Sequence, residues 1–191
     1  MDSTLLATKL RSPPLSRQRV PRPGLLQALE HNVVDHRLTS VAAPAGYGKT
    51  TLLTEWAHAS QVPVCWLSLD RDENDPDRFF RYLFTAWRSQ HPDLASHVLG
   101  HVLSVAAPDR EAVLAAFLHA AESLSDHSIL ILDDYHLIVE PAIHEAMTFL
   151  LDHAPPTLHL VLAGRSEPPL PLARYRARRD LFELGPQDLR L

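Results

Sequence analysis

The sequence predicts an α/β fold in which a parallel five-stranded sheet is sandwiched by helices. Short apolar runs alternate along the chain with segments that have the apolar spacing of amphipathic helices. The apolar run at 129–132 has no polar residue at alternate positions, which indicates a strand covered on both faces. One further run is followed by a glycine-containing loop and a helix. With 191 residues, 46% of them hydrophobic, the chain is long enough for one such domain with a substantial core.

The expected elements follow one another in a regular order. Residues 11–23 are rich in proline and arginine, which is typical of an extended arm, and they lead into a short helix from Pro23 to about residue 30. We expect residues 1–30 to pack on an α/β domain formed by residues 31–191. The five strands are expected at 38–42, 64–69, 129–132, 158–163 and 181–184. Helices are expected after the glycine-containing loop, from residue 76, at about 109–123 and at about 143–153.

The helix expected from residue 76 is indicated by its start signal and by an aromatic stripe. Asp75 suits the N-cap position and Pro76 the first helical position. The apolar side chains that follow recur at helical spacing and indicate core packing; they are Phe79, Phe80, Leu83, Phe84 and Trp87. The acidic run at 70–75 lacks the central glycine of a calcium loop, so a turn with a helix cap is the better interpretation.

The glycine-containing loop has the pattern of a phosphate-binding loop. Its residues are Ala43, Pro44, Ala45, Gly46, Tyr47, Gly48, Lys49, Thr50 and Thr51. The glycines let backbone N–H groups turn inward, and the following helix N-terminus adds positive charge at the same point. Lys49 is expected to neutralise the β and γ phosphates, and Thr50 to place its hydroxyl on Mg²⁺. The pattern begins with Ala43 in place of glycine, which is acceptable where the backbone does not require a positive φ.

The alternative for this loop is a surface turn with an exposed lysine. The chain has sixteen arginines and two lysines, and one of the lysines stands where a compact point charge is needed. The composition therefore favours the phosphate-binding loop. With a parallel sheet, this loop predicts a P-loop NTPase with the strand order 5-1-4-3-2.

Two adjacent carboxylates form the second chemical element. The apolar strand at 129–132 ends in Asp133 and Asp134, at the sheet edge where ligands bind in open parallel sheets. Asp133 is expected to hold Mg²⁺ together with Thr50. Asp134 is placed to orient or deprotonate the attacking water, and because it is one methylene shorter than glutamate we expect slow hydrolysis. The alternative is a solvated turn that caps the next segment.

Arg165 follows the fourth expected strand. It reaches the γ-phosphate if that strand lies between the first and the third, and it is otherwise a surface arginine.

Several function classes are disfavoured by composition. The net charge of −5 gives no electrostatic footprint for nucleic acid, so the late arginines are expected on a solvated or interdomain face. The single cysteine, Cys65, fits a reducing cytoplasm, and no apolar run approaches membrane-spanning length, so we expect a cytoplasmic chain without a membrane contact. The twelve histidines lack paired zinc spacing, and no lysine stands in a guanine-binding N-K-x-D motif.

Beyond single motifs, the chain resembles the nucleotide-binding domain of the MalT-like, LuxR-type large ATP-binding transcriptional regulators, which belong to the STAND class of P-loop ATPases. The resemblance extends almost from end to end. It rests on T-K-L at 8–10, the loop at 43–51, W-L-S-L-D at 66–70, N-D-P at 74–76, L-D-D-Y-H at 132–136 and P-P-L-P-L-A-R at 168–174. Gly164 stands where similar proteins usually have serine, before the retained Arg165.

The resemblance implies a switch that binds ATP or ADP with Mg²⁺ and hydrolyses ATP slowly. It places phosphate binding on 43–51, magnesium binding and hydrolysis on Asp133 and Asp134, and γ-phosphate sensing on Arg165, with residues 20–22 near the adenine. It also implies that the remaining domains of a parent regulator are partners, that the full-length ATP-bound form self-associates, and that DNA is contacted only through a C-terminal domain. We expect the helical, sensor and helix-turn-helix regions to be absent from these 191 residues.

Two other functions remain open from the residues alone. A small-molecule P-loop kinase would use Arg174, Arg176 and Arg178 as a phosphate-clamping lid. A non-hydrolysing interaction module would retain ADP as a structural ligand.

Overall fold

A single five-stranded sheet runs through the computed structural model, which describes residues 5–15, 20–93 and 110–190. All strand pairs are parallel and their order is β2-β3-β4-β1-β5. This order is the predicted 5-1-4-3-2 taken from the other edge, so the predicted sheet is confirmed. The strands are β1 (Leu38–Ala42), β2 (Val64–Ser68), β3 (Ser128–Asp133), β4 (Leu158–Gly164) and β5 (Leu181–Leu184).

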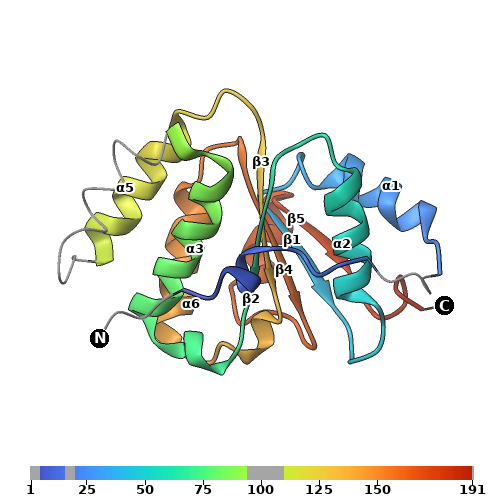
Figure 1. Ribbon diagram of the computed structural model, residues 1–191. Helices are drawn as coiled ribbons and strands as arrows, with labels where there is room; N and C mark the ends of the chain where they lie inside the picture. Colours follow the sequence, from blue (N-terminus) through green and yellow to red (C-terminus); the bar gives the residue numbers. More distant parts are fainter. Residues whose placement is uncertain (1–4, 16–19, 94–109, 191) are drawn as a thin grey trace.

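Helices cover both faces of the sheet (Figure 1). One face carries α1 (Pro23–Asn32) and α2 (Lys49–Ala59). The other carries α3 (Pro76–Gln90), α5 (Arg110–Glu122), α6 (Pro141–His153) and the short α7 (Leu172–Arg178). Successive residues of β3 point to opposite faces, so Ile131 packs with the first layer and Leu132 with the second. Because both faces are covered, every residue of β3 and β4 is buried.

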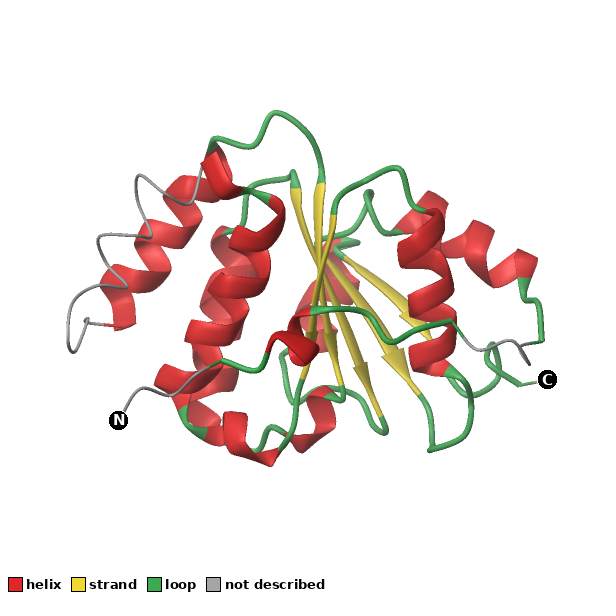
Figure 2. Cartoon of the chain, in the orientation of Figure 1, coloured by secondary structure: helices red, strands yellow, loops and turns green. Residues whose placement is uncertain are grey.

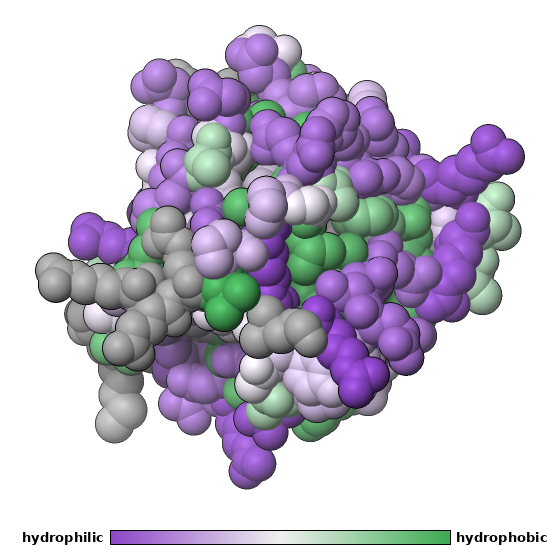
Figure 3. All heavy atoms as spheres, turned by 90° about the vertical axis from the view of Figure 1, so that its right-hand side faces the viewer, coloured by the Kyte–Doolittle hydropathy of each residue, from purple (hydrophilic) through white to green (hydrophobic). Residues whose placement is uncertain are grey.

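The helices bury their apolar sides and leave polar residues outside. The aromatic stripe of α3 lies in the core, and Phe79, Leu83, Phe84 and Trp87 are fully buried there. Figure 3 shows the side that carries α1 and α2, where the surface is mostly hydrophilic. No helix in the described part of the chain is long and apolar enough to cross a bilayer.

Local signals explain where the helices begin. Asp75 accepts a hydrogen bond from the backbone N–H of Arg78 at 2.8 Å, so the predicted cap of α3 is confirmed. Helix α6 begins at Pro141, two residues before the predicted start, because Pro141 fits the first turn and the Glu140 carboxylate accepts from the N–H of Ala142. The predicted helix at 109–123 appears as α5, and Asp109 lies outside the described residues.

The sequence did not predict α7 or three short 3₁₀ segments. These segments are η1 (Ala7–Leu10), η2 (Arg71–Asn74) and η3 (Tyr135–Leu137). Such short turns have no 3.6-residue pattern by which they could be recognised.

Lys9 connects the N-terminal segment to the acidic run after β2 through ion pairs. The Lys9 ammonium lies 2.7 Å from both carboxylate oxygens of Glu73 and 2.6 Å from Oδ2 of Asp70. Glu73 is fully buried, and the Nε of Arg78 donates to it as well, at 3.1 Å. The acidic run therefore supplies a helix cap and a buried ion-pair cluster. In the described part of the chain, no group of three or more His, Cys, Asp or Glu residues is arranged to hold a metal ion.

Candidate phosphate-binding site

The predicted site residues meet at the carboxyl edge of the sheet. Figure 2 shows the five strand arrows pointing the same way, so the ends of β1, β3 and β4 lie along one edge. The loop at 43–48 follows β1, Asp133 closes β3, and Arg165 comes directly after β4. Because β4 lies between β1 and β3, the condition on which the role of Arg165 depended is met.

The loop takes its shape from two glycines. Gly46 has a φ of 85° and Gly48 a φ of 75°, the left-handed region that side chains with a Cβ rarely adopt. Ala43 does not have a positive φ, and its N–H donates to the carbonyl of Gly164 at 3.2 Å. The alanine in place of the motif's first glycine is therefore accommodated without backbone strain. Gly48 is also the N-cap of α2, so the loop leads directly into a helix N-terminus.

Lys49 is the buried cation of the loop. The residue is 8% exposed, and Nζ donates to the carbonyls of Ala43 at 2.7 Å and Pro44 at 3.0 Å. Burial lowers the pKa of Lys49, while the nearby charges of Asp133 and Asp134 act in the opposite direction. An ammonium has three donors, so one N–H remains for a phosphate oxygen. Thr51, by contrast, is exposed in the first turn of α2.

Asp133 and Thr50 form a direct pair. The Thr50 hydroxyl donates to Oδ2 of Asp133 at 2.8 Å, and the N–H of Asp134 donates to Oδ1 at 3.1 Å. Asp133 is 3% exposed, and burial raises its carboxyl pKa to about 6 despite the Thr50 hydrogen bond. A hydroxyl beside a buried carboxylate is a donor set that suits a hard divalent cation such as Mg²⁺. The residues therefore fit the expected metal, since its charge would stabilise the ionised carboxylate.

Asp134 lies next to this pair in a strained backbone conformation. Its φ is 60° and its ψ 32°, in the left-handed region, and it precedes η3. Its side chain is half exposed, with Oδ1 3.8 Å from Nδ1 of His136. The carboxylate is thus accessible to solvent at the sheet edge, whereas that of Asp133 is not.

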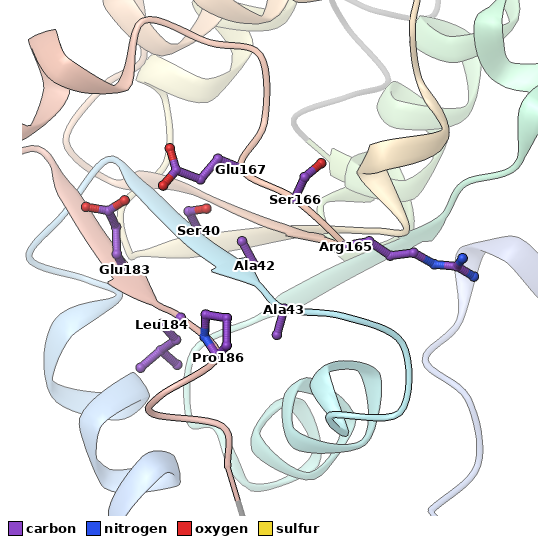
Figure 4. Close-up of a pocket in the computed structure, with 10 residues that line it drawn as sticks. Ser40, Ala42, Ala43, Arg165, Ser166, Glu167, Glu183, Leu184 and Pro186 are labelled. Atoms are coloured by element: carbon purple, nitrogen blue, oxygen red, sulfur yellow. The ribbon is translucent and has the colours of Figure 1, made fainter.

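Arg165 is exposed and lies within electrostatic range of Lys49. A pocket of about 250 Å³ opens beside it at the ends of β1, β4 and β5. Figure 4 shows that the guanidinium of Arg165 points away from the labelled pocket residues Glu167 and Glu183. The guanidinium therefore lies outside the part of this pocket that the two glutamates line.

Three neighbours of the site were not assigned a specific contact from sequence. Arg22 donates from Nη1 to the carbonyl of Tyr47 at 3.1 Å, so the segment expected near the adenine contacts the loop. A Cβ at Gly164 would lie 3.1 Å from the carbonyl of Ser166, so glycine permits a tight turn there. His136 lies against Gly164 in η3. It belongs to the L-D-D-Y-H motif, but nothing in the sequence pattern assigns it a role.

The arginines considered as a kinase lid are engaged elsewhere. On α7, Arg174 lies 2.6 Å from Asp152, and Arg178 contacts the same carboxylate at 3.7 Å. Arg176 donates to both oxygens of Glu183, at 2.7 and 2.6 Å. These partly exposed pairs fit the solvated or interdomain face that composition favours.

Comparisons with known proteins identify the family and the relatives of this chain. The family model described as AAA domain matches residues 31–168. MalT, an HTH-type transcriptional regulator, is 41% identical over 192 residues in Serratia proteamaculans and 38% identical in Cronobacter sakazakii. Each alignment covers 97% of this chain and 20% of the relative, so the chain spans about a fifth of the length of the curated relatives it matches. Among solved structures, Cdc6p from Pyrobaculum aerophilum is similar in fold, with a TM-score of 0.51 at 16% identity over 88% of this chain and 47% of that one.

Proposed function

Because the chain belongs to the AAA domain family and is homologous to part of MalT, we propose that it is an ATP- and ADP-binding switch domain of a MalT-like transcriptional activator, with slow Mg²⁺-dependent ATP hydrolysis. The observation that supports this most is the contact between the Thr50 hydroxyl and Asp133, beside the buried ammonium of Lys49. This contact supports a cation site and a phosphate site side by side at the end of a parallel sheet.

Each residue has a defined task in this proposal. The free backbone N–H groups of the loop at 43–51 and the Lys49 ammonium bind the phosphates, and Thr50 and Asp133 hold the metal. Mg²⁺, when bound, neutralises charge on the phosphate oxygens. Asp134 orients the attacking water and accepts its proton, and Arg165 stabilises negative charge on the terminal phosphate.

The role of a switch is favoured over that of a metabolic enzyme. The Asp134 side chain is short, so it reaches less far towards the attacking water. It is also half exposed, so the site excludes bulk solvent poorly, and both features favour slow turnover. The relatives are about five times as long as this chain, and they are named as transcriptional regulators. We propose that the remaining domains of the parent regulator supply DNA binding through a C-terminal domain, that its ATP-bound form self-associates, and that it acts in the cytoplasm.

Calorimetric titration tests this function. The purified chain is titrated with ATP and with ADP, each in Mg²⁺ and in EDTA, and Thr50→Val is compared with the wild type. We expect ATP to bind more tightly in Mg²⁺ than in EDTA. In T50V the increase in affinity caused by Mg²⁺ should be about tenfold smaller, because valine keeps the shape of threonine but lacks the hydroxyl ligand. ATP affinity that is equal in Mg²⁺ and EDTA would contradict the metal site.

The reaction is followed separately by phosphate release. We expect slow release to water, with no phosphoryl transfer to small-molecule acceptors. Transfer to an acceptor would favour a kinase. Tightly held ADP in the purified protein with no turnover would favour a non-hydrolysing module instead.

A further inference from the structure

One histidine at the site has no hydrogen-bonding partner. Both ring nitrogens of His136 are buried, and neither has a hydrogen bond to any group in the described chain. Its Nδ1 lies 3.8 Å from Oδ1 of Asp134, which is too long for a hydrogen bond. A buried polar atom left without a partner destabilises the folded state. The fold therefore keeps this ring in place at a cost in stability.

Other substantially buried histidines of the described chain are partnered. His159 bonds to His127 at 2.7 Å and to a backbone carbonyl at 3.0 Å. His91 bonds to Ser128 at 2.7 Å, and His144 to the hydroxyl of Tyr135 at 3.0 Å. Burial alone therefore does not explain the unpartnered ring of His136.

The position of the ring indicates what its partner is. The residue is fixed in η3, directly after the strained backbone of Asp134. A Cβ at Gly164 would be 3.5 Å from Cβ and from the backbone nitrogen of His136, so the end of β4 lies directly against this residue. Lys49, Asp134 and Arg165 all lie within electrostatic range of the ring. These are the residues proposed to surround the last phosphate and the attacking water.

We propose that His136 contacts the terminal phosphate of ATP, donating a hydrogen bond from a ring nitrogen to a γ-phosphate oxygen. The contact distinguishes a nucleoside triphosphate from a diphosphate, because ADP has no oxygen at that place. This inference rests on the proposed function. A hydrogen bond to a charged group contributes about 1.5–3 kcal/mol, which corresponds to a roughly 10- to 150-fold preference.

Two substitutions of similar size separate this role from a structural one. His136→Phe fills the space of the ring without nitrogens, and His136→Gln keeps an amide donor. If the ring serves only the fold through an ordered water, H136F loses that hydrogen bond and destabilises the protein. If the ring serves the ligand, H136F removes two unsatisfied nitrogens, so the stability of the nucleotide-free protein is unchanged or higher.

The experiment measures the affinities of the full chain for Mg²⁺-ATP and Mg²⁺-ADP by calorimetry, together with the melting temperature without nucleotide. We expect H136F to weaken ATP binding roughly 10- to 150-fold and ADP binding by less than about twofold, with no loss of melting temperature. H136Q is expected to recover part of the ATP affinity. His144→Phe is the matched control, since it breaks the bond to Tyr135; it should lower the melting temperature and leave the ATP to ADP ratio unchanged.

Three results would overturn the inference. An equal loss of ATP and ADP affinity in H136F, or no loss of either, would show that His136 does not contact the γ-phosphate. If H136F melts well below the wild type and H136Q keeps the wild-type ratio of ATP affinity to ADP affinity, the His136 ring has a structural role only. Wild-type protein that binds neither nucleotide would instead refute the proposed function, and this inference with it.

Discussion

The hydroxyl of Thr50 and the carboxylate of Asp133 are joined by a 2.8 Å hydrogen bond across 83 residues of sequence. Thr50 stands in the first turn of α2, and Asp133 is the last residue of β3. Their meeting depends on the parallel sheet, which brings the end of β3 to the same edge as the loop after β1. The contact unites the two chemical elements of the site, and the following predictions concern the residues around it.

Replacing Asp133 by asparagine is expected to stabilise the nucleotide-free protein at pH 7. Burial raises the pKa of the carboxyl from 3.8 to about 6, so the folded state favours the protonated form. The unfolded chain ionises near pH 4, and the destabilisation therefore grows as the pH rises from about 4 through 6. D133N removes that charge and is expected to gain up to about 3 kcal/mol at pH 7 and little at pH 4. Urea unfolding at both pH values checks this, and a D133N protein less stable than the wild type at pH 7 would contradict it.

Replacing Asp134 by asparagine is expected to separate turnover from binding. Asparagine keeps the size and the tolerance for a left-handed backbone but cannot accept a proton from water. We expect the hydrolysis rate to fall by about 10²- to 10⁴-fold, with ATP affinity changed by less than about twofold. Single-turnover phosphate release gives the rate. Asp126→Asn, in the exposed turn before β3, serves as the control. Full turnover in D134N would show that another group activates the attacking water.

The ion pairs of Lys9 are expected to stabilise the fold without affecting the nucleotide. Lys9→Ala leaves the fully buried Glu73 with Arg78 as its remaining cationic partner, and we expect a loss of about 3 kcal/mol in the free energy of unfolding. Arg11→Ala, at an exposed position of the same segment, should change stability by less than about 0.5 kcal/mol. Chemical denaturation measures both variants. Equal stabilities of K9A and R11A would show that the cluster does not hold the segment.

The buried His159, at the opposite end of the sheet, makes stability sensitive to acid. His159 is 2% exposed and bonds to His127 and to the carbonyl of His36. Burial lowers the pKa of His159; the His36 carbonyl and the charge of Asp35 oppose this shift, while His127 and Arg37 favour it. Because the folded pKa lies below that of the unfolded chain, the stabilisation is present above about pH 6.5 and is lost as the pH falls.

Comparison of two glutamine variants tests this pH dependence. Between pH 7.5 and 5.5 we expect the wild type to lose more stability than His159→Gln, whereas the exposed His153→Gln should follow the wild type. If the wild type and H159Q lose the same stability between pH 7.5 and 5.5, His159 is not the source of the pH dependence.

The sheet and the centre of the site were predictable because their signals are local. Gly46, Gly48 and Lys49 stand next to one another, and the uniformly apolar β3 ends directly at Asp133. Strand order followed from the motif's known place in parallel sheets. Asp75 and Pro76 marked the start of α3 through cap chemistry. In each of these cases neighbouring residues carry the information.

The remaining features depend on contacts between distant residues. Lys9 and Glu73 are 64 residues apart, and an acidic run gives no sign that one of its members is fully buried. The segment around α7 is short and follows prolines at 168, 169 and 171, which hid its helical pattern. His136 stood out only when the structure showed two ring nitrogens without partners.

The central claim is that the loop at 43–51 binds the phosphates of a nucleotide through Lys49, and one titration tests it most directly. The chain has two lysines, both partly or fully buried among hydrogen-bonding partners, so each serves as the other's control. Calorimetry with Mg²⁺-ATP is expected to show at least a tenfold loss of affinity in Lys49→Ala, because a charged hydrogen bond to phosphate is removed, and no loss in folded K9A. Unchanged ATP affinity in K49A would contradict the account.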